Sequence, residues 1–339
     1  MKNIKSLEYL KSIKLQVFNI IQGYLPVKTP DAHYDMVLDY PNRQGKYFRP
    51  GLLLLSCEMY GGNIEEALLS AAAIQLSEDW LLIHDDVEDG SEERRGKPTL
   101  NVLHGNELAI NAGDALHVIM WQILGDNINL LGDNRGHQIY NLFNQTLLTT
   151  IEGQYLDLSW IHSDQVEVEE SNYFDMITRK TCYYTAVAPL QIGAIIAGQT
   201  KKELESIKDW AIPFGYAFQI WDDCMNLTST KQGKELAGDI LEGKRTLILS
   251  HLLKNCSDAE KEKVIKIYLK NRGDKQEGDK QYILALMHGY GSIKYAQGIA
   301  KNYSASALKV FESNTDHLKG SIYKQYIQEL MEFVVNREQ

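Results

Sequence analysis

Residues 65–90 read EEALLSAAAIQLSEDWLLIHDDVEDG. The stretch is rich in Ala and Leu and has no Pro or Gly before its last residue, so it predicts a long helix that ends there. On that helix Asp85 and Asp89 lie on one face about one turn apart, with Asp86 beside Asp89. An apolar helix that ends in clustered carboxylates predicts a helical protein with an acidic site at the helix end.

Helical periodicity continues along the rest of the chain. Between Ile293 and Val310 apolar residues recur at steps of three and four, the spacing of one helix face, and no series alternates as a strand would. Prolines number 7 in 339 residues, which permits long helices. We expect breaks in the segments 26–30, 41–45, 90–98, 228–243 and 271–280. No low-complexity linker divides the chain, so the sequence predicts one all-α domain over residues 1–339.

The composition excludes several classes of function. Lys and Arg total 35 against 45 Asp and Glu, a formal net charge of −10, whereas a general nucleic-acid binder needs a basic face. The uncharged residues 181–200 contain Pro189 and Gly193, so we interpret them as a buried helix and expect no integral membrane segment. The four cysteines form no CxxC pair. That spacing is typical of a cytoplasmic protein rather than a disulfide scaffold or a structural zinc site.

A second acidic cluster repeats the first. Residues 218–226 read FQIWDDCMN, so Asp222 and Asp223 follow an apolar run as Asp85 and Asp86 do, within the shared pattern Ile-x-Asp-Asp. Carboxylates this close repel each other unless a cation lies between them. Proteins hold Mg²⁺ with a few carboxylates together with substrate phosphates. Two matching clusters therefore predict a magnesium site.

Basic residues accompany the acidic clusters in the sequence. They fall in five groups, at residues 45–50, 94–98, 179–181, 233–234 and 242–245. Arginine binds phosphate oxygens in pairs, and lysine supplies a mobile point charge. One such group alone would indicate only a surface salt bridge. Clustered cations combined with metal-bridging carboxylates predict a site for a polyanion such as a diphosphate.

Eight short motifs occur in the order typical of one protein family. They are Gly45-Lys46-x-x-Arg49-Pro50, Asp85-Asp86-x-x-Asp89, Arg94-Arg95-Gly96, Gly153-Gln154-x-x-Asp157, Lys180-Thr181, Phe218-Gln219-x-x-Asp222-Asp223, Gly233-Lys234 and Gly243-Lys244. With them the chain resembles the trans-polyprenyl diphosphate synthases, which include the farnesyl and geranylgeranyl diphosphate synthases. The resemblance implies an all-α isoprenyl synthase fold, a large helical bundle around a deep central cavity, and a homodimer.

The resemblance also implies roles for residues of these motifs. Three Mg²⁺ ions per active site would be held by Asp85, Asp86, Asp89, Asp222, Asp223 and Asn226. The allylic diphosphate would be contacted by Arg94, Lys180, Lys234 and Lys244, with Thr181 and Gln219 as nearby polar contacts. The diphosphate of the second substrate, isopentenyl diphosphate, would be bound by Lys46, Arg49 and Arg95.

The activity that the resemblance implies is head-to-tail condensation of isopentenyl diphosphate with an allylic diphosphate. Cleavage of the allylic carbon–oxygen bond leaves a diphosphate anion and an allylic cation, and metal and cationic side chains stabilise the developing negative charge. The cation needs a dry apolar cavity, because water would quench it. The isopentenyl double bond attacks and a proton is lost, which we expect the released diphosphate to accept.

Two other functions remain open from the sequence. A class I terpene cyclase shares the metal-assisted ionisation but has no site for a second substrate, and Lys46, Arg49 and Arg95 argue against it. A non-catalytic regulatory subunit of another prenyl synthase typically loses aspartates or basic residues, and this chain keeps nearly all of them.

Glu78 departs from the family pattern. Members commonly have His or Gln seven residues before Asp85, in contact with isopentenyl diphosphate. A carboxylate there repels a diphosphate unless a cation pairs with it, so Glu78 either orients Lys46 or Arg49 or weakens the site. In the second motif Asn226 replaces the last Asp, and its amide oxygen can still bind Mg²⁺ or its water.

Product length is expected to depend on what blocks the cavity below the first motif. Trp80 lies five residues before Asp85, about 7.5 Å along a helix, and Leu81 lies four before it. A bulky ring there would stop a growing chain, unless Trp80 is only a core residue. In the family this pattern resembles geranylgeranyl synthases, whereas farnesyl synthases often have a second aromatic residue where Leu81 stands. The predicted product is geranylgeranyl diphosphate, with farnesyl diphosphate second.

Overall fold

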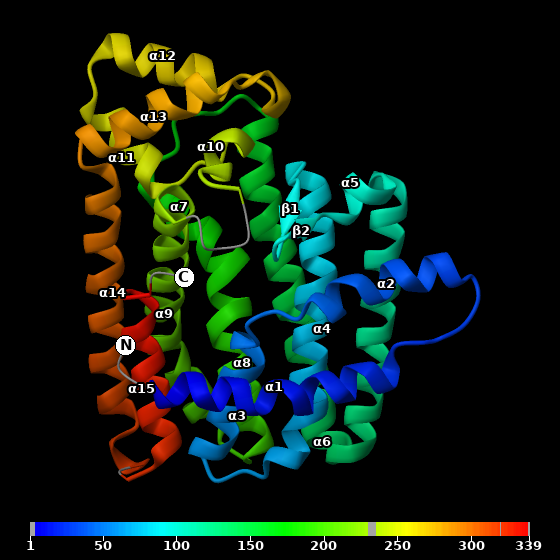
Figure 1. The fold of residues 1–339 in the computed structure, drawn as a ribbon. Coiled ribbons are helices and arrows are strands. Elements are labelled where there is room, and N and C mark those ends of the chain that lie inside the picture. Colours follow the sequence, from blue (N-terminus) through cyan, green and yellow to red (C-terminus); the bar gives the residue numbers. More distant parts are fainter. Residues whose placement is uncertain (1–3, 230–234, 319, 338–339) are drawn as a thin grey trace.

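The computed structural model describes residues 4–229, 235–318 and 320–337. Helices dominate it, so the predicted all-α fold is confirmed (Figure 1). The α-helices are α1 Lys5–Tyr24, α2 Asp31–Arg43, α3 Phe48–Met59, α4 Ile64–Asp89, α5 Leu100–His104, α6 Asn106–His162, α7 Glu170–Ile177, α8 Ala188–Ile196, α9 Lys201–Thr228, α10 Gly238–Glu242, α11 Leu247–Asn255, α12 Asp258–Tyr268, α13 Glu277–Gly289, α14 Ser292–Asn314 and α15 Ile322–Val334. Short 3₁₀ turns lie at Arg272–Asp274 and Asp316–Leu318.

Helix α4 carries the first acidic cluster and begins and ends where its sequence predicts. The Asn63 side chain accepts a hydrogen bond from the backbone N–H of Glu65 and caps its start, and the helix stops at Gly90. Most of its middle is buried, and it packs against α6. The apolar run before the aspartates therefore fixes α4 in the core and leaves its last turn at the site.

The longest helices run side by side in Figure 1, with α1 crossing them and α11–α13 over one end. Helix α9 packs against α14, and α3 against α8. Helix α6 changes direction at Gly132, whose φ of 78° and ψ of 165° are not helical. A residue with a side chain rarely adopts such a φ. This kink divides α6 into two parts, and the second part carries Asp157 to the site.

The uncharged residues 181–200 form a buried helical segment, as predicted. Thr178–Val187 is a π-helix, in which each N–H bonds five residues back, and it continues directly into α8. Nearly every side chain in the two elements is buried. Among the residues that the structure describes, no helix is long and apolar enough to cross a membrane.

One local expectation was wrong and another was displaced by a few residues. The sequence shows no strand pattern, but the segment after α4 is a small antiparallel hairpin of β1 Glu93–Arg94 and β2 Lys97–Pro98. Its two-residue turn requires only positive φ at the turn, not long alternating strands. The break expected at 41–45 is present but begins only after Arg43, because Pro41 lies inside the last turn of α2. Burial of Val37 and Tyr40 holds that helix together although the proline donates no hydrogen bond.

Candidate active site

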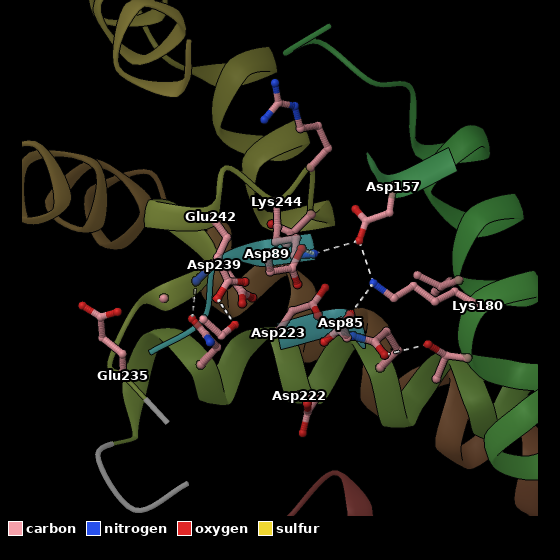
Figure 2. Close-up of a pocket in the computed structure, with 18 of the residues that line it drawn as sticks. Asp85, Asp89, Asp157, Lys180, Asp222, Asp223, Glu235, Asp239, Glu242 and Lys244 are labelled. Carbon is pink, nitrogen blue, oxygen red and sulfur yellow. Dashed lines mark hydrogen bonds and ion pairs between the residues drawn. The ribbon is translucent and has the colours of Figure 1, made fainter. Parts of the chain in front are cut away.

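A polar cavity of about 190 Å³ lies where the ends of α4 and α9 meet the hairpin and the segment around α10. Figure 2 shows Lys180, Lys244 and Asp157 pointing toward one another, with Asp85 and Asp89 beside them. Ten residues expected to act in the site line it, namely Asp85, Asp89, Arg94, Lys180, Thr181, Gln219, Asp222, Asp223, Asn226 and Lys244. The fold therefore brings both acidic clusters and most of the predicted cations to one place.

Asp86 lies elsewhere. Its carboxylate is fully buried and accepts hydrogen bonds from the Tyr40 hydroxyl at 2.5 Å and from Arg94 Nε at 2.9 Å. It does not line either cavity of the site. Asp86 thus anchors Arg94 at the hairpin, and Arg94 reaches Asp85 at 3.4 Å. Lys234 lies outside the described residues.

Two lysines pair with the first acidic cluster and with Asp157 of α6. Lys180 Nζ lies 2.7 Å from Asp157 Oδ2 and 3.7 Å from Asp85 Oδ1. Lys244 Nζ lies 2.6 Å from Asp89 Oδ1 and 3.2 Å from the same Asp157 oxygen. Burial alone would raise the pKa of Asp157, but Lys180 and Lys244 hold it well below its usual range. The two ammonium groups are therefore charged and ready to bind an anion.

The second acidic cluster is held by neighbours on α7 and α9. Asp223 accepts hydrogen bonds from the Tyr173 hydroxyl and from Gln219 Nε2, both at 2.7 Å, and Gln219 Oε1 accepts one from Thr181. Burial raises the pKa of Asp223 to about 7, against these hydrogen bonds. Asp222 points away from the other carboxylates in Figure 2 and pairs with Arg337 at 3.0 Å.

Asn226, the last residue of the second motif, forms a hydrogen bond with the backbone of the segment around α10. Its side-chain oxygen accepts a hydrogen bond from the backbone N–H of Asp239 at 3.2 Å, and the residue is buried. This contact ties the end of α9 to α10.

The carboxylates suit Mg²⁺ by their chemistry. Magnesium prefers oxygen ligands and usually takes only one or two carboxylates, completing its shell with waters and substrate phosphates. Asp85, Asp89 and Asp222 offer such oxygens along one cavity. Over residues 4–229, 235–318 and 320–337, no three acidic, histidine or cysteine side chains form a ready metal cage. The lysines and Arg337 neutralise the aspartates instead, so a metal would take over carboxylates that are now paired with cations.

A second, less polar cavity of about 350 Å³ adjoins the first and shares Asp85, Lys180 and Gln219 with it. The residues that it adds are a mixture of apolar or aromatic side chains and polar or charged ones. They include Arg49, Glu78, Trp80, Leu81, Thr150, Ile151, Tyr184 and Phe218. Such a cavity has the lining that a hydrocarbon chain needs.

Glu78 pairs with two of the arginines expected to bind isopentenyl diphosphate. Its Oε2 lies 2.8 Å from Arg49 Nη1, and its Oε1 lies 3.4 Å from Arg95 Nη2. Arg49 also donates to Thr185 at 2.9 Å and lies 4.5 Å from the centre of the Tyr184 ring. Lys46, also expected here, is exposed at the start of this region. These contacts give Arg49 a fixed orientation.

Arg95 has a second acidic partner, Asp79. Its Nη1 donates to Asp79 at 2.9 Å and to the backbone oxygen of Tyr40 at 2.9 Å. Burial raises the pKa of Asp79 to about 6, although Arg95 opposes the shift.

Trp80 is buried and lies against aromatic neighbours below the first acidic cluster. Its ring centre is 4.6 Å from that of His117 and 5.6 Å from that of His84. The indole N–H of Trp121 donates a hydrogen bond to His117 Nε2 at 2.8 Å. Trp80 and Leu81 both line the second cavity.

The sequence did not single out several residues of the site. Asp157 belongs to a motif that we noted without a role, and its lysine partners are distant in the sequence. Three further carboxylates, Glu235, Asp239 and Glu242, line the polar cavity because α10 folds over it. The sequence indicated only that they lie in the expected break at 228–243, with Glu242 also in the basic group at 242–245.

Comparison with known proteins agrees with this geometry. The family model described as polyprenyl synthetase matches residues 31–287. The chain belongs to the polyprenyl synthetase family. It is 32% identical to the geranylgeranyl diphosphate synthase of Sulfolobus acidocaldarius over 97% of this chain and 98% of that protein. It is 36% identical to the short chain isoprenyl diphosphate synthase of Methanocaldococcus jannaschii over 75% of each chain.

A solved structure agrees as well. The geranylgeranyl pyrophosphate synthetase from Pyrococcus horikoshii superposes with a TM-score of 0.85 at 31% identity, covering 98% of this chain and 99% of that one. Membership of the polyprenyl synthetase family confirms the predicted resemblance, the isoprenyl synthase fold and a prenyl-transferring enzyme. The alternatives of a terpene cyclase or a regulatory subunit find no support.

Proposed function

We propose that this enzyme condenses isopentenyl diphosphate with an allylic diphosphate and releases mainly geranylgeranyl diphosphate. The observation that carries the proposal is that two cavities adjoin each other and share Asp85 and Lys180. The first is polar and is lined by both acidic clusters, and the second is less polar and has Trp80 in its wall. The first suits a diphosphate and the second a prenyl chain. The name of the relative from Sulfolobus acidocaldarius supports the product.

On this proposal Asp85, Asp89 and Asp222 would hold Mg²⁺, with Asp86, Asp223 and Asn226 in support. Bound magnesium would neutralise negative charge on the diphosphate as it leaves, which favours the ionisation step. Asp86 would act through Arg94, because it touches that guanidinium rather than the cavity. Asp223 would act by holding Gln219 and Tyr173.

Lys180, Lys244 and Arg94 would bind the allylic diphosphate from three sides of the polar cavity. The fold fixes the positions of these three cations. They would therefore stabilise the negative charge that develops on the leaving diphosphate without having to move far. Thr181 and Gln219 form a hydrogen-bonded pair beside them and would orient the diphosphate. Lys234 would add a further cation.

Isopentenyl diphosphate would be bound by Arg49 and Arg95, together with Lys46. Arg49 lines the second cavity, and Arg95 lies beside it through their common partner Glu78. The apolar cavity would exclude water from the allylic cation. The double bond attacks there, and the proton lost from the new carbon chain passes to the diphosphate that has just left.

The decisive experiment is incubation of the purified protein with Mg²⁺, isopentenyl diphosphate and, in turn, dimethylallyl, geranyl and farnesyl diphosphate. We expect a twenty-carbon diphosphate from all three. A hydrocarbon released from the allylic substrate alone would indicate a cyclase and overturn the proposal. Asp85→Asn is expected to reduce turnover by about a hundredfold or more, with unchanged thermal stability.

We further propose a single domain, a homodimer and a place in the cytoplasm. Exposed apolar side chains gather on α5 and α6, where a second copy would cover them. They are Val102, Leu103, Leu108, Ile110, Val118, Leu130, Leu148, Ile151 and Tyr155. The four cysteines are unpaired, which suits a reducing compartment. Light scattering of the purified protein should give twice the 38.6 kDa chain mass, and a monomer would contradict the dimer.

A further inference from the structure

The motif Gly153-Gln154-x-x-Asp157 lies on α6 and has no role in the proposal so far. Each of its three named residues faces another part of the site. A Cβ at Gly153 would lie 2.2 Å from the backbone nitrogen of Lys180, so only glycine lets α6 approach the π-helix there. Gln154 Nε2 donates to Asp85 at 3.2 Å and to Glu88 at 2.7 Å. One stretch of α6 thus contacts both the lysines and the first acidic cluster.

Asp157 joins two lysines that come from different parts of the chain. A single oxygen, Oδ2, accepts hydrogen bonds from Lys180 Nζ at 2.7 Å and from Lys244 Nζ at 3.2 Å (Figure 2). The carboxylate is 3% exposed. A buried carboxylate with two ammonium partners fixes where both of them lie, because moving either one would break a charged hydrogen bond away from water.

Among the residues that the structure describes, each lysine forms a further ion pair with a carboxylate of the first cluster. Lys244 contacts Asp89 and Lys180 approaches Asp85. If Mg²⁺ takes Asp85 and Asp89, as proposed above, these pairings are lost. Asp157 lies outside both acidic clusters, and it would then be the carboxylate that still holds the two lysines.

We propose that Asp157 is a positioning residue, which keeps the ammonium groups of Lys180 and Lys244 at the spacing that the allylic diphosphate requires. The inference rests on the proposed function. In this role Asp157 acts through the lysines, although it also lies in the wall of the polar cavity. Its negative charge opposes diphosphate binding, and the gain comes from the geometry that it imposes on two cations.

The test uses this opposition between charge and geometry. In Asp157→Asn the site gains one net positive charge, which by itself would tighten diphosphate binding. If Asp157 positions the lysines, calorimetry at fixed Mg²⁺ should show inorganic diphosphate binding about tenfold more weakly. The dissociation constant of isopentenyl diphosphate should be unchanged, because Arg49 and Arg95 are not held by Asp157. Unchanged or tighter binding of inorganic diphosphate to a folded variant would overturn the proposal.

Glu152→Gln is the matched control. Glu152 lies on the same helix as Asp157 and pairs with Arg179, the residue before Lys180, at 3.1 Å. Unlike Asp157 and its lysines, the side chains of Glu152 and Arg179 are largely open to solvent, at 50% and 41% exposed. The substitution removes an equal charge from the same pair of elements, and diphosphate binding should stay unchanged. If Asp157→Asn does not fold, Asp157→Glu decides the question. It keeps the charge but displaces the carboxylate, and it should weaken diphosphate binding by about threefold or more.

These outcomes are separate from the fate of the proposed function. If the unchanged enzyme makes no prenyl product, the function fails whatever the binding measurements show. If it makes product and Asp157→Asn binds inorganic diphosphate normally, only the role of Asp157 fails.

Discussion

Glu78 Oε2 accepts a hydrogen bond from Arg49 Nη1 at 2.8 Å. This carboxylate therefore orients one of the cations expected to bind isopentenyl diphosphate, and it also lies near Arg95. With Asp79 beside it, two negative charges face two arginines. The formal charges of these four residues therefore cancel.

Glu78→Gln should tighten isopentenyl diphosphate binding. Glutamine keeps an acceptor for Arg49 but removes the charge that repels the substrate, so KM for isopentenyl diphosphate should fall by about threefold to tenfold, which is about 1 kcal/mol. Steady-state kinetics with each substrate varied in turn would measure it. KM for the allylic substrate is the internal control. A higher KM for isopentenyl diphosphate would mean that orienting Arg49 matters more than repulsion.

Trp80→Ala should lengthen the product. Removing the ring opens the apolar cavity toward His117, and products longer than twenty carbons should appear in chromatography of the reaction mixture. The change leaves a large void and should lower the free energy of unfolding by about 3–5 kcal/mol, so Trp80→Leu provides a milder version.

Trp121→Ala is the control for that experiment. Trp121 supports His117 from behind and does not line the cavity. We expect its product length to stay the same. If Trp80→Ala and Trp80→Leu both leave product length unchanged, Trp80 is only a core residue.

Gly153→Ala should destabilise the protein. The added methyl would overlap the backbone of Lys180, and packing conflicts of this kind cost about 1–3 kcal/mol. Denaturant unfolding would measure the loss. Gly125→Ala tests the same substitution on the same helix in open space, where it should raise the free energy of unfolding by about 0.4–1 kcal/mol. Equal effects at the two positions would contradict the close approach.

Asp79 should make stability depend on pH. Burial raises its pKa in the folded state to about 6, above the ordinary value near 3.9 that an unfolded chain has. The folded protein then holds a proton that the unfolded chain loses, so the stability from Asp79 is present below about pH 4 and is lost as the pH rises to about 6. The total is up to about 3 kcal/mol.

Unfolding of the unchanged protein and of Asp79→Asn across pH 4–7 would test this. The asparagine does not titrate, so the unfolding free energy of the unchanged protein minus that of the variant should fall between pH 4 and pH 6. A constant difference would show that Asp79 stays ionised in the folded state.

Much of the site could be predicted because local patterns place it. The apolar run before Asp85 makes α4 a core helix, and helical spacing then puts Asp85 and Asp89 on one face. The same spacing could not show that Asp86 turns inward, because its partners Tyr40 and Arg94 come from other segments. Asp157 and Arg337 were missed for the same reason, since each acts on residues far away in the sequence.

The π-helix Thr178–Val187 contributes residues to the walls of both cavities. Lys180 and Thr181 face the polar cavity, while Thr185 binds Arg49. In this segment each backbone hydrogen bond spans five residues, one more than in an α-helix. Losing a single residue here would rotate everything after it by about 100°, turning Thr185 away from Arg49 while Lys180 stayed in place. Two related sequences could therefore share every motif and still differ in the position of Thr185, if an alignment shows a one-residue gap in this segment.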